Sequence, residues 1–467
     1  MSLHEIDPDE ELASEVLRPG DDEYDDAARV FAGTGRPALV VRPRSPVEVA
    51  EAVAYGVRHE LPVSVRSGGH SVLGHGTNVD GLVIDLARLD AVEVLDTDRR
   101  LVRVGGGARW GAVAAALDPY DWGLTSGDTT SVGVGGLTLG GGIGWMVRRH
   151  GLAVDNLVGA RVVTADGRLV TASAHEHPDL FWALRGGGGN FGVVVDFDFV
   201  AQPVGGVHVG RAVYRPDDPA DLLLRWRYAM RRAPDELSST LVLMPELPGS
   251  PPAATVLLCY AGEPGASVTE ADAAIEPLLE LGTVLEATVA ERRYAEVLED
   301  AHHPPGVRVI GRNILAPTLS ADLAQAIARL HRSPVPAAVA VRSLGGAFGR
   351  VPAQATAFAH RDAEALVVCG FMVPADLADA SVEPMLAPWR EVAMHGTGTY
   401  LNFQGSATPE DLAAAYPPAT YERLAAVKAA YDPGNVFALN HNIEPRRRGS
   451  AGASASPSGW GRPGDAR

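Results

Sequence analysis

Short runs of apolar residues, each closed by Gly, Pro or Asp, dominate the first two hundred residues and predict a unit built of short strands. Two longer runs with helical spacing lie between them, at 45–59 and 109–117, and the first begins with Ser-Pro, a cap followed by a first-turn proline. The predicted strands are 38–42, 62–66, 82–86, 101–104, 157–164, 169–171 and 191–200. After an acidic leader ending near residue 32, this pattern indicates an α+β unit.

From about residue 206, longer apolar runs alternate with amphipathic stretches, which predicts one sheet covered by helices and a second core. The predicted strands are 207–214, 240–244, 255–260, 284–291, 338–344 and 365–372, and the predicted helices are 220–232, 268–281, 321–332 and 382–394. The low-complexity tail at 446–467 is expected to be disordered.

Composition narrows the classes of function. The chain has 467 residues, which favours two domains, and its 40 Lys and Arg against 58 Asp and Glu give a net charge of −18. Such an acidic chain is a poor partner for nucleic acid or anionic membranes. No run of about 20 apolar residues occurs, and the start lacks the features of a signal peptide, so we expect a cytoplasmic protein. Cys259 and Cys369 lie in apolar runs and are expected to be buried thiols, and no metal-binding pattern is present.

The chain has 52 glycines, and they form dense clusters at 68–69, 105–107, 133–144 and 186–192. Consecutive glycines let the backbone turn sharply and bring several N–H groups onto one anion, such as a pyrophosphate. Each glycine in a helix costs roughly 0.5–1 kcal/mol against alanine, so residues 133–144 are expected to be neither a stable helix nor a plain strand. The clusters predict a backbone wall for a large flat or phosphorylated ligand.

Two competing motifs fit poorly. The run 105–111 follows a predicted strand, but its last glycine comes one residue too late for a dinucleotide-binding Gly-x-Gly-x-x-Gly motif. The run 69–73 approaches the Gly-x-Ser-x-Gly motif of serine hydrolases around Ser71, but Leu73 stands where glycine is required. A hydrolase therefore stays only a remote alternative.

Several ordered motifs together resemble one family: RSGGHS at 66–71, GVGGLTLGGGIGW from Gly133, RGGGGNFG at 185–192, and YERLAAVKAAYDPGNVFALNHNI at 421–443. The chain resembles the FAD-linked oxidases of the vanillyl-alcohol oxidase superfamily, in the berberine bridge enzyme-like branch. The resemblance implies a two-domain FAD-binding fold of the p-cresol methylhydroxylase type. Residues 1–205 (core 34–204) would bind FAD, 206–399 would form an α/β substrate domain on an antiparallel sheet, and 400–445 would return to the FAD domain.

The resemblance also assigns cofactor contacts. His70 matches the histidine that forms an 8α bond to the flavin, whereas Thr129 stands where some relatives have a second, cysteinyl link, so one covalent bond is expected. Val132 matches the oxygen gatekeeper, and a small valine there favours an oxidase. The other residues expected to contact FAD are Arg66, Ser67, Gly68, Gly69, Ser71, Gly133, Gly136, Asn156 and Val193, with Asn440 and Asn442 near the isoalloxazine.

The catalytic base is left open by the sequence. Many relatives take a substrate proton with the second tyrosine of Tyr-x-Asn-Tyr, but this chain has Phe403 at that position. Tyr400 is the nearest candidate, although on a strand its side chain and that of Phe403 would face opposite sides. A base from the substrate domain, or amine oxidation without a base, are the alternatives.

The resemblance thus implies an FAD-dependent oxidase that transfers hydride from a small-molecule alcohol, amine or secondary metabolite to covalently bound FAD, with O2 as acceptor. A flavin-dependent dehydrogenase or cyclase that does not use O2 is the alternative. The expected partners are the small-molecule substrate and O2, and neither nucleic acid nor a membrane is expected. The sequence does not predict the oligomeric state.

Overall fold

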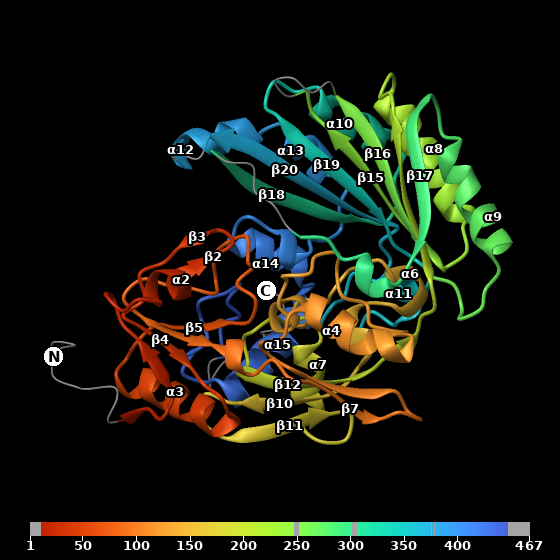
Figure 1. The fold of residues 1–467 in the computed structure, drawn as a ribbon. Helices are drawn as coiled ribbons and strands as arrows, with labels where there is room; N and C mark the ends of the chain where they lie inside the picture. The colour runs from red at the N-terminus through yellow and green to blue at the C-terminus, as the bar shows by residue number, and fades with distance from the viewer. Residues whose placement is uncertain (1–10, 247–251, 301–305, 375, 378, 447–467) are drawn as a thin grey trace, which may run out of the picture.

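The largest element of the fold is a seven-stranded antiparallel sheet, which fills the upper half of the molecule in Figure 1. The computed structural model describes residues 11–246, 252–300, 306–374, 376, 377 and 379–446. In spatial order the strands of this sheet are β17 (Val284–Arg292), β14 (Val207–Tyr214), β16 (Ala253–Tyr260), β15 (Leu237–Met244), β19 (Ala337–Ser343), β20 (Ala365–Pro374) and β18 (Val307–Ala316).

Helices cover one face of this sheet, because every second residue of the central strands is apolar and buried there. The helices in this layer are α8 (Pro219–Arg232), α9 (Val268–Leu279), α10 (Ala321–His331) and α13 (Trp389–Ala393). Asp218, Ser267 and Ser320 cap the first three, each accepting hydrogen bonds from backbone N–H groups of the first turn. The core is centred on Trp226, whose indole N–H donates to Ser239 Oγ at 3.0 Å.

Two smaller sheets form the lower half of the molecule (Figure 1). One is antiparallel and has the order β11 (Leu169–Ser173), β10 (Leu157–Val163), β12 (Val193–Val200), β8 (Leu101–Gly105), β7 (Val92–Asp96). The other has the order β1 (Glu15–Leu17), β4 (Leu39–Arg42), β6 (Leu82–Asp85), β5 (Val63–Arg66), and its last three strands are parallel. Helix α3 (Pro46–Arg58) connects β4 to β5, and Ser45 caps it, as the Ser-Pro pair predicts. Two-stranded ladders pair β2 (Arg29–Val30) with β3 (Gly33–Thr34) and β9 (Trp122–Gly123) with β13 (Gln202–Pro203).

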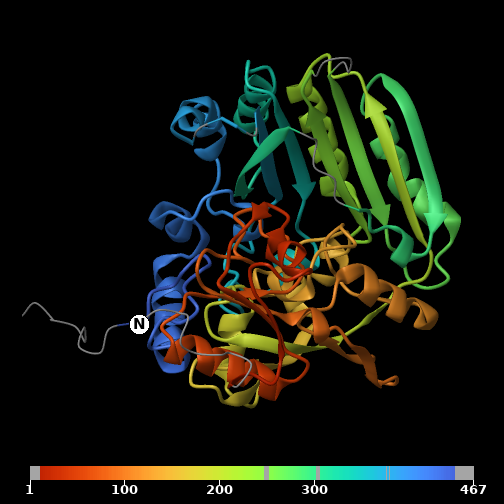
Figure 2. The same cartoon turned by 60° about the vertical axis from the view of Figure 1, so that its left-hand side comes forward.

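The end of the chain returns from the upper sheet to the lower half. Helices α14 (Pro409–Ala415) and α15 (Pro418–Tyr431) follow the last strand of the upper sheet, and Leu424 and Val427 of α15 share an apolar cluster with Phe181 of α7 (Pro178–Leu184). Figure 2 shows these helices in blue beside the lower half and apart from the green strands of the upper sheet. The shared cluster joins parts of the chain that lie more than two hundred residues apart.

The expected α+β class and the antiparallel sheet after residue 206 are confirmed. Residues 133–144 were expected to form neither a stable helix nor a plain strand, and the run contains one short helix, α5 (Val134–Leu139), that was not predicted. The single helix predicted at 382–394 is wrong. Proline residues divide that stretch into α12 (Asp379–Val382), a 3₁₀ turn at Glu383–Leu386 and α13. Strand β18 was not predicted.

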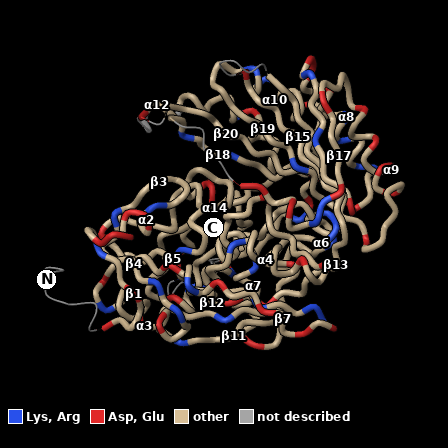
Figure 3. The backbone as a smooth tube through the Cα atoms, in the orientation of Figure 1, with Lys and Arg blue, Asp and Glu red and all other residues tan. Residues whose placement is uncertain are grey.

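Other sequence expectations concern exposure and charge. Cys259 and Cys369 are buried free thiols, as predicted, and burial raises the pKa of Cys259 to about 12. No helix in the described part of the chain is long and apolar enough to cross a membrane. Figure 3 shows acidic and basic residues interleaved over both halves of the molecule. One ion pair joins Arg103 Nε to Asp198 Oδ1 at 2.7 Å. The predicted disordered tail lies, from residue 447 on, outside the described residues.

Candidate active site

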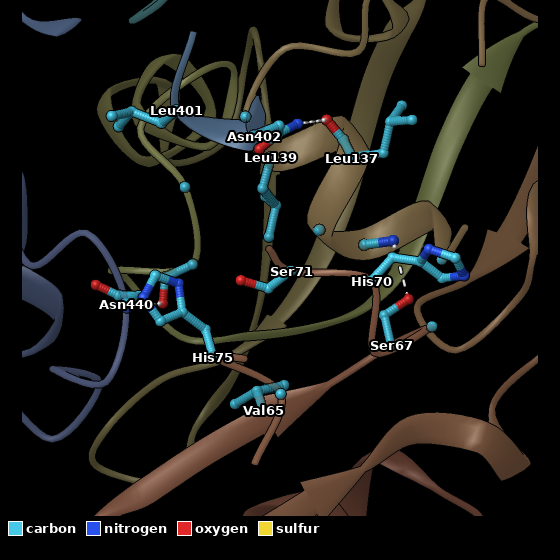
Figure 4. A pocket seen from close by; sticks show the side chains of 18 of the residues that line it. Val65, Ser67, His70, Ser71, His75, Leu137, Leu139, Leu401, Asn402 and Asn440 are labelled. Atoms are coloured by element: carbon cyan, nitrogen blue, oxygen red, sulfur yellow. Dashed lines mark hydrogen bonds between the residues drawn. The ribbon is translucent and has the colours of Figure 1, made fainter. Parts of the chain in front are cut away.

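A cavity of about 390 Å³ lies where the glycine clusters of the lower half meet the segment that follows the upper sheet. Its wall is built from the ends of strands β5 and β12, the loop before α5, α5 itself and residues 400–404 and 437–441. Figure 4 shows Ser67, His70 and Ser71 on one side of it, and Leu137, Leu139 and Asn402 on another. Ten of the predicted cofactor residues line this cavity: Arg66, Ser67, Gly68, Gly69, His70, Ser71, Val132, Gly133, Gly136 and Asn440.

The loop after β5 is held in place by the side chains of Arg66 and Ser67. Arg66 pairs with the buried Asp85 at 2.5 Å and also donates to the carbonyl of Ala27, so its guanidinium is already engaged by the protein. The Ser67 hydroxyl donates to Gly106 O at 2.6 Å and accepts the N–H of Gly135 at 3.2 Å. The Ser67 side chain therefore connects three of the four glycine clusters.

Glycines in the wall have two different structural causes. The backbones of Gly68 and Gly133 touch, because a Cβ added to either would lie 2.3 Å or less from the backbone nitrogen of the other. At Gly136 and Gly189 an added Cβ would meet no protein atom within 4 Å, although both residues line the cavity. The space that these two glycines leave free is therefore cavity, not core, and a flat or phosphorylated ligand such as FAD fits such a wall.

The polar groups of the cavity also fit FAD. Residues 67–71, Gly133 and Gly136 line it, and backbone N–H groups of such glycine-rich segments can bind pyrophosphate without lysine or arginine. The Oδ1 atom of Asn440 is buried and has no hydrogen-bond partner among the described residues, so it leaves an acceptor for a ligand N–H or O–H. His70 lies on the wall with its ring stacked on Phe31 at 4.8 Å, which fixes the plane of the imidazole.

Three predicted cofactor residues do not line the cavity. Asn156 is buried and holds its own loop, donating to the carbonyls of His150 and Leu152 and accepting from Gln202. Val193, the first residue of β12, is fully buried in an apolar cluster, while its neighbours Gly192 and Val194 line the cavity. Asn442 points to Glu444, with Nδ2 to Oε1 at 3.1 Å. Strand alternation and the local turns decide these orientations, and neither can be read from a motif alone.

Tyr400 reaches the cavity but is badly placed to act as a base. It is 2% exposed, and its hydroxyl oxygen accepts hydrogen bonds from Gly142 N–H at 3.2 Å and Asn402 Nδ2 at 2.8 Å. Burial raises the pKa of the Tyr400 hydroxyl above its usual value, and these hydrogen bonds act in the opposite direction. The strand argument is wrong here, because Leu401–Phe403 is a 3₁₀ turn and the rings of Tyr400 and Phe403 lie 5.3 Å apart.

Several cavity residues were missed by motif reasoning: His75, Asp128, Asn190, Gln404 and His441. The rings of His75 and His441 meet edge to face at 5.1 Å, and burial, with a smaller contribution from His441, lowers the pKa of His75 to about 4. Asp128 directly precedes Thr129, so its position beside a singled-out residue was the one available signal. No group of three or more His, Cys, Asp or Glu within the described ranges is arranged to hold a metal ion.

Comparison with known proteins gives the same picture. A family model described as "FAD binding domain" matches residues 37–173, and one described as "Berberine and berberine like" matches residues 399–444. An (R)-6-hydroxynicotine oxidase from Paenarthrobacter nicotinovorans is 33% identical over 463 residues, which cover 93% of this chain and 97% of that protein.

Solved structures resemble the whole described fold. The crystal structure of 6-hydroxy-D-nicotine oxidase from Arthrobacter nicotinovorans has a TM-score of 0.84 at 30% identity, covering 93% of this chain and 98% of that one. A glucooligosaccharide oxidase from Acremonium strictum, which carries a 6-S-cysteinyl, 8α-N1-histidyl FAD, has a TM-score of 0.79 at 25% identity, with the same coverage of both chains.

Proposed function

Because this chain belongs to the FAD-linked oxidases of the vanillyl-alcohol oxidase superfamily, in the berberine bridge enzyme-like branch, we propose that it oxidises a small-molecule alcohol, amine or secondary metabolite with covalently bound FAD and O2. The observation that carries this proposal is the glycine wall of the cavity, where Gly136 and Gly189 leave space that no protein atom fills. FAD, when bound, supplies the two-electron oxidation, and the protein binds and orients cofactor and substrate.

The division of labour that we propose follows the chain. Residues 1–205 together with 400–445 would hold FAD, and residues 206–399 would cover the substrate. Backbone N–H groups of 67–71, Gly133 and Gly136 would hold the phosphates, because the guanidinium of Arg66 is already paired with Asp85. This arrangement also explains how so acidic a chain can bind an anionic cofactor.

We further propose that His70 carries the flavin and that no second bond forms. His70 lies on the cavity wall with its ring stacked on Phe31, so an imidazole nitrogen of His70 would hold the flavin through its 8α carbon. The new N–C bond would replace a C–H bond, whose proton is released, and the two electrons left on the flavin would pass to O2. Thr129 also lines the cavity, and a hydroxyl cannot form the thioether that a cysteine would. The glucooligosaccharide oxidase described above has both links, so the expected difference is the loss of the cysteinyl one.

The flavin content of purified protein tests both parts of the proposal. We expect yellow protein whose flavin stays attached after acid precipitation, and His70→Ala protein that releases its flavin under the same treatment. Colourless wild-type protein would refute the FAD-binding proposal, whereas yellow protein that releases its flavin would refute only the covalent bond.

The acceptor is tested separately. Val132 lines the cavity and is half-buried, so a leucine there would narrow the space in front of it. We expect wild-type protein to release peroxide during turnover, and Val132→Leu protein to keep flavin reduction by substrate while losing rate in reoxidation by O2. Wild-type flavin that is reduced by substrate but not reoxidised by O2 would instead support a dehydrogenase.

A further inference from the structure

A single carboxylate, that of Asp128, lines the cavity among the residues that the structure describes. It comes from the loop between β9 and α5, directly before Thr129 and four residues before Val132. This loop and the segment 400–404 both border the cavity, so Asp128 shares the wall with Tyr400 and Phe403. Phe403 has no ionisable group, and burial raises the pKa of the Tyr400 hydroxyl, which disfavours the phenolate that would have to accept a proton.

The backbone and one carboxylate oxygen of Asp128 are fixed by the protein. Its backbone carbonyl accepts the N–H of Glu299 at 3.0 Å, and its Oδ2 accepts a hydrogen bond from Arg342 Nη2. Arg342 belongs to β19 of the upper sheet, and its Nε donates to Thr240 Oγ1 at 3.1 Å. An ion pair therefore bridges the two halves of the molecule beside the cavity.

The other carboxylate oxygen is open to a ligand. Among the described residues, the one hydrogen bond to Oδ1 is from the Thr129 hydroxyl at 3.5 Å, and it is long and weak. The Asp128 side chain is 40% exposed, whereas that of Arg342 is 12% exposed. The carboxylate is therefore the more accessible partner of this ion pair. The guanidinium of Arg342 is further held over the ring of Trp145, at 5.5 Å from its centroid.

The chemistry of the wall favours a substrate with a basic nitrogen. The one Lys or Arg lining the cavity in the described ranges is Arg66, and its charge is matched by Asp85. An ammonium N–H donating to an ionised carboxylate forms a hydrogen bond roughly twice as strong as a neutral one, whereas an anionic substrate would meet Asp128 with like charge. The carboxylate is thus the one charged group with a free acceptor that a substrate would meet.

We propose that Asp128 Oδ1 binds the ammonium group of an amine substrate and accepts its proton. This inference rests on the proposed function, which supplies FAD as the two-electron oxidant. The ammonium N–H bond breaks and its proton forms an O–H bond with Asp128. FAD, when bound, would take the hydride from the α-carbon of the neutral amine, which would leave as the iminium product. Arg342 is a positioning residue, because it turns Oδ2 away from the cavity and leaves Oδ1 exposed to it.

Three variants of the holoprotein test this proposal. Asp128→Asn keeps the shape but accepts no proton, and Asp128→Glu restores the carboxylate. Asp235→Asn is the matched control, because Asp235 also pairs with an arginine, Arg350 at 2.6 Å, is 35% exposed and does not line the cavity. Anaerobic flavin bleaching is followed with 6-hydroxynicotine and small secondary amines, each beside the alcohol of the same shape.

We expect Asp128→Asn to slow bleaching by amines about 10²-fold or more, with partial rescue in Asp128→Glu. A second readout needs no turnover. Benzyltrimethylammonium, a cation with no proton to give, should perturb the flavin absorbance, and its Kd should rise about tenfold in Asp128→Asn but not in Asp235→Asn.

The inference is overturned if the flavin of Asp128→Asn holoprotein bleaches with amines at the wild-type rate, or if this variant binds benzyltrimethylammonium as tightly as wild type. Either result leaves the proposed flavin chemistry intact. An equal loss of rate for amines and alcohols in Asp128→Asn also overturns it, because it would indicate a general effect of the substitution. Colourless wild-type protein would instead refute the proposed function itself, so the two failures are distinguishable.

Discussion

The single lysine of the chain, Lys428, makes a buried ion pair whose loss should be measurable. Lys428 and Asp432 are both 0% exposed, with Nζ to Oδ2 at 2.7 Å, one helical turn apart. The ammonium also donates to the carbonyls of Asn190 at 2.8 Å and Phe437 at 3.0 Å, and both of these residues line the cavity. We predict that Asp432→Asn destabilises the protein and loosens two parts of the cavity wall.

The size of the effect follows from what is left behind. Removing one partner of a buried ion pair leaves an uncompensated charge and costs about 3–5 kcal/mol. Burial lowers the pKa of Lys428, and the hydrogen bond and charge of Asp432 raise it, so Asp432→Asn lowers that pKa further. Between the lowered pKa of the folded protein and the ordinary value of about 10.4, the unfolded chain binds more protons than the folded one, so the stability of the variant rises with pH across that window.

Urea unfolding, followed by tryptophan fluorescence, gives the comparison. It should be run near neutral pH and at about pH 9.5, where the difference between wild type and Asp432→Asn should shrink. The double variant Lys428→Met with Asp432→Asn should recover part of the loss, because no charge is then buried. The control is Asp221→Asn, since Asp221 forms an exposed pair with Arg225 at 2.7 Å, also one helical turn apart, and such pairs contribute about 0–1 kcal/mol.

Two results would refute this reasoning. A loss in Asp432→Asn no larger than that in Asp221→Asn would mean that Lys428 is neutral or reaches water when Asp432 is gone. A double variant as unstable as Asp432→Asn would mean that the lost carboxylate contacts, and not the buried charge, are the cause. Flavin content per chain, measured on the same samples, reports whether the cavity wall has moved.

Three further predictions concern the cavity. Gly136→Ala points a methyl group into space free of protein atoms, so the variant should fold but retain less flavin per chain, whereas Gly282→Ala, away from the cavity, should retain all of it. Tyr400→Phe leaves two N–H donors without their acceptor and should lower the unfolding free energy by about 1–3 kcal/mol, with an unchanged rate of anaerobic flavin bleaching; a large loss of rate would restore Tyr400 as the base. Burial lowers the pKa of His75 to about 4 from the ordinary 6.5, so between these pH values the unfolded chain binds more protons than the folded one and stability falls as pH falls. In thermal unfolding, His75→Gln should make the unfolding temperature less dependent on pH between 4 and 6.5. An unchanged dependence would contradict the assignment to His75.

Local patterns predicted most of the elements because both halves follow a simple rule of burial. Strands such as β14 alternate or run apolar between turn residues, and helices such as α8 begin at a capping residue with proline after it. Strand β18 was missed because Arg308, Arg312 and Asn313 interrupt its apolar pattern. It lies at the edge of the sheet beside β20, and on its other side Leu315 forms a bridge with Gly398. Arg308 donates to Leu377 O and Asn313 to Tyr400 O, so tertiary contacts offset the polar residues.

The candidate site could be predicted where a motif determines the path of the backbone. It could not be predicted where tertiary contacts decide whether a side chain points into the cavity or away from it. The loop 66–71 lies in the cavity as a whole, because consecutive glycines and the contacts of Ser67 position its backbone. Asn156 and Asn442 were expected to contact FAD from the same resemblance, but they hydrogen-bond to their own neighbours and do not line the cavity. Asp128 shows the reverse case, because its direction depends on Arg342, more than two hundred residues later in the chain.

Glycine in these clusters meets two different requirements, close contact between two backbones and free space in the cavity, and the sequence alone does not distinguish them. Gly68 and Gly133 are needed because two backbones touch, so a side chain there would push the loops apart whether or not a ligand is bound. Gly136 and Gly189 have no such neighbour, so the only thing that excludes a side chain there is what the cavity holds. Substitutions at the first pair should therefore damage folding, and those at the second pair should damage binding alone. The second pair makes the clusters functional, because a protein that needed only tight turns would have no reason to keep glycine at positions open to a cavity.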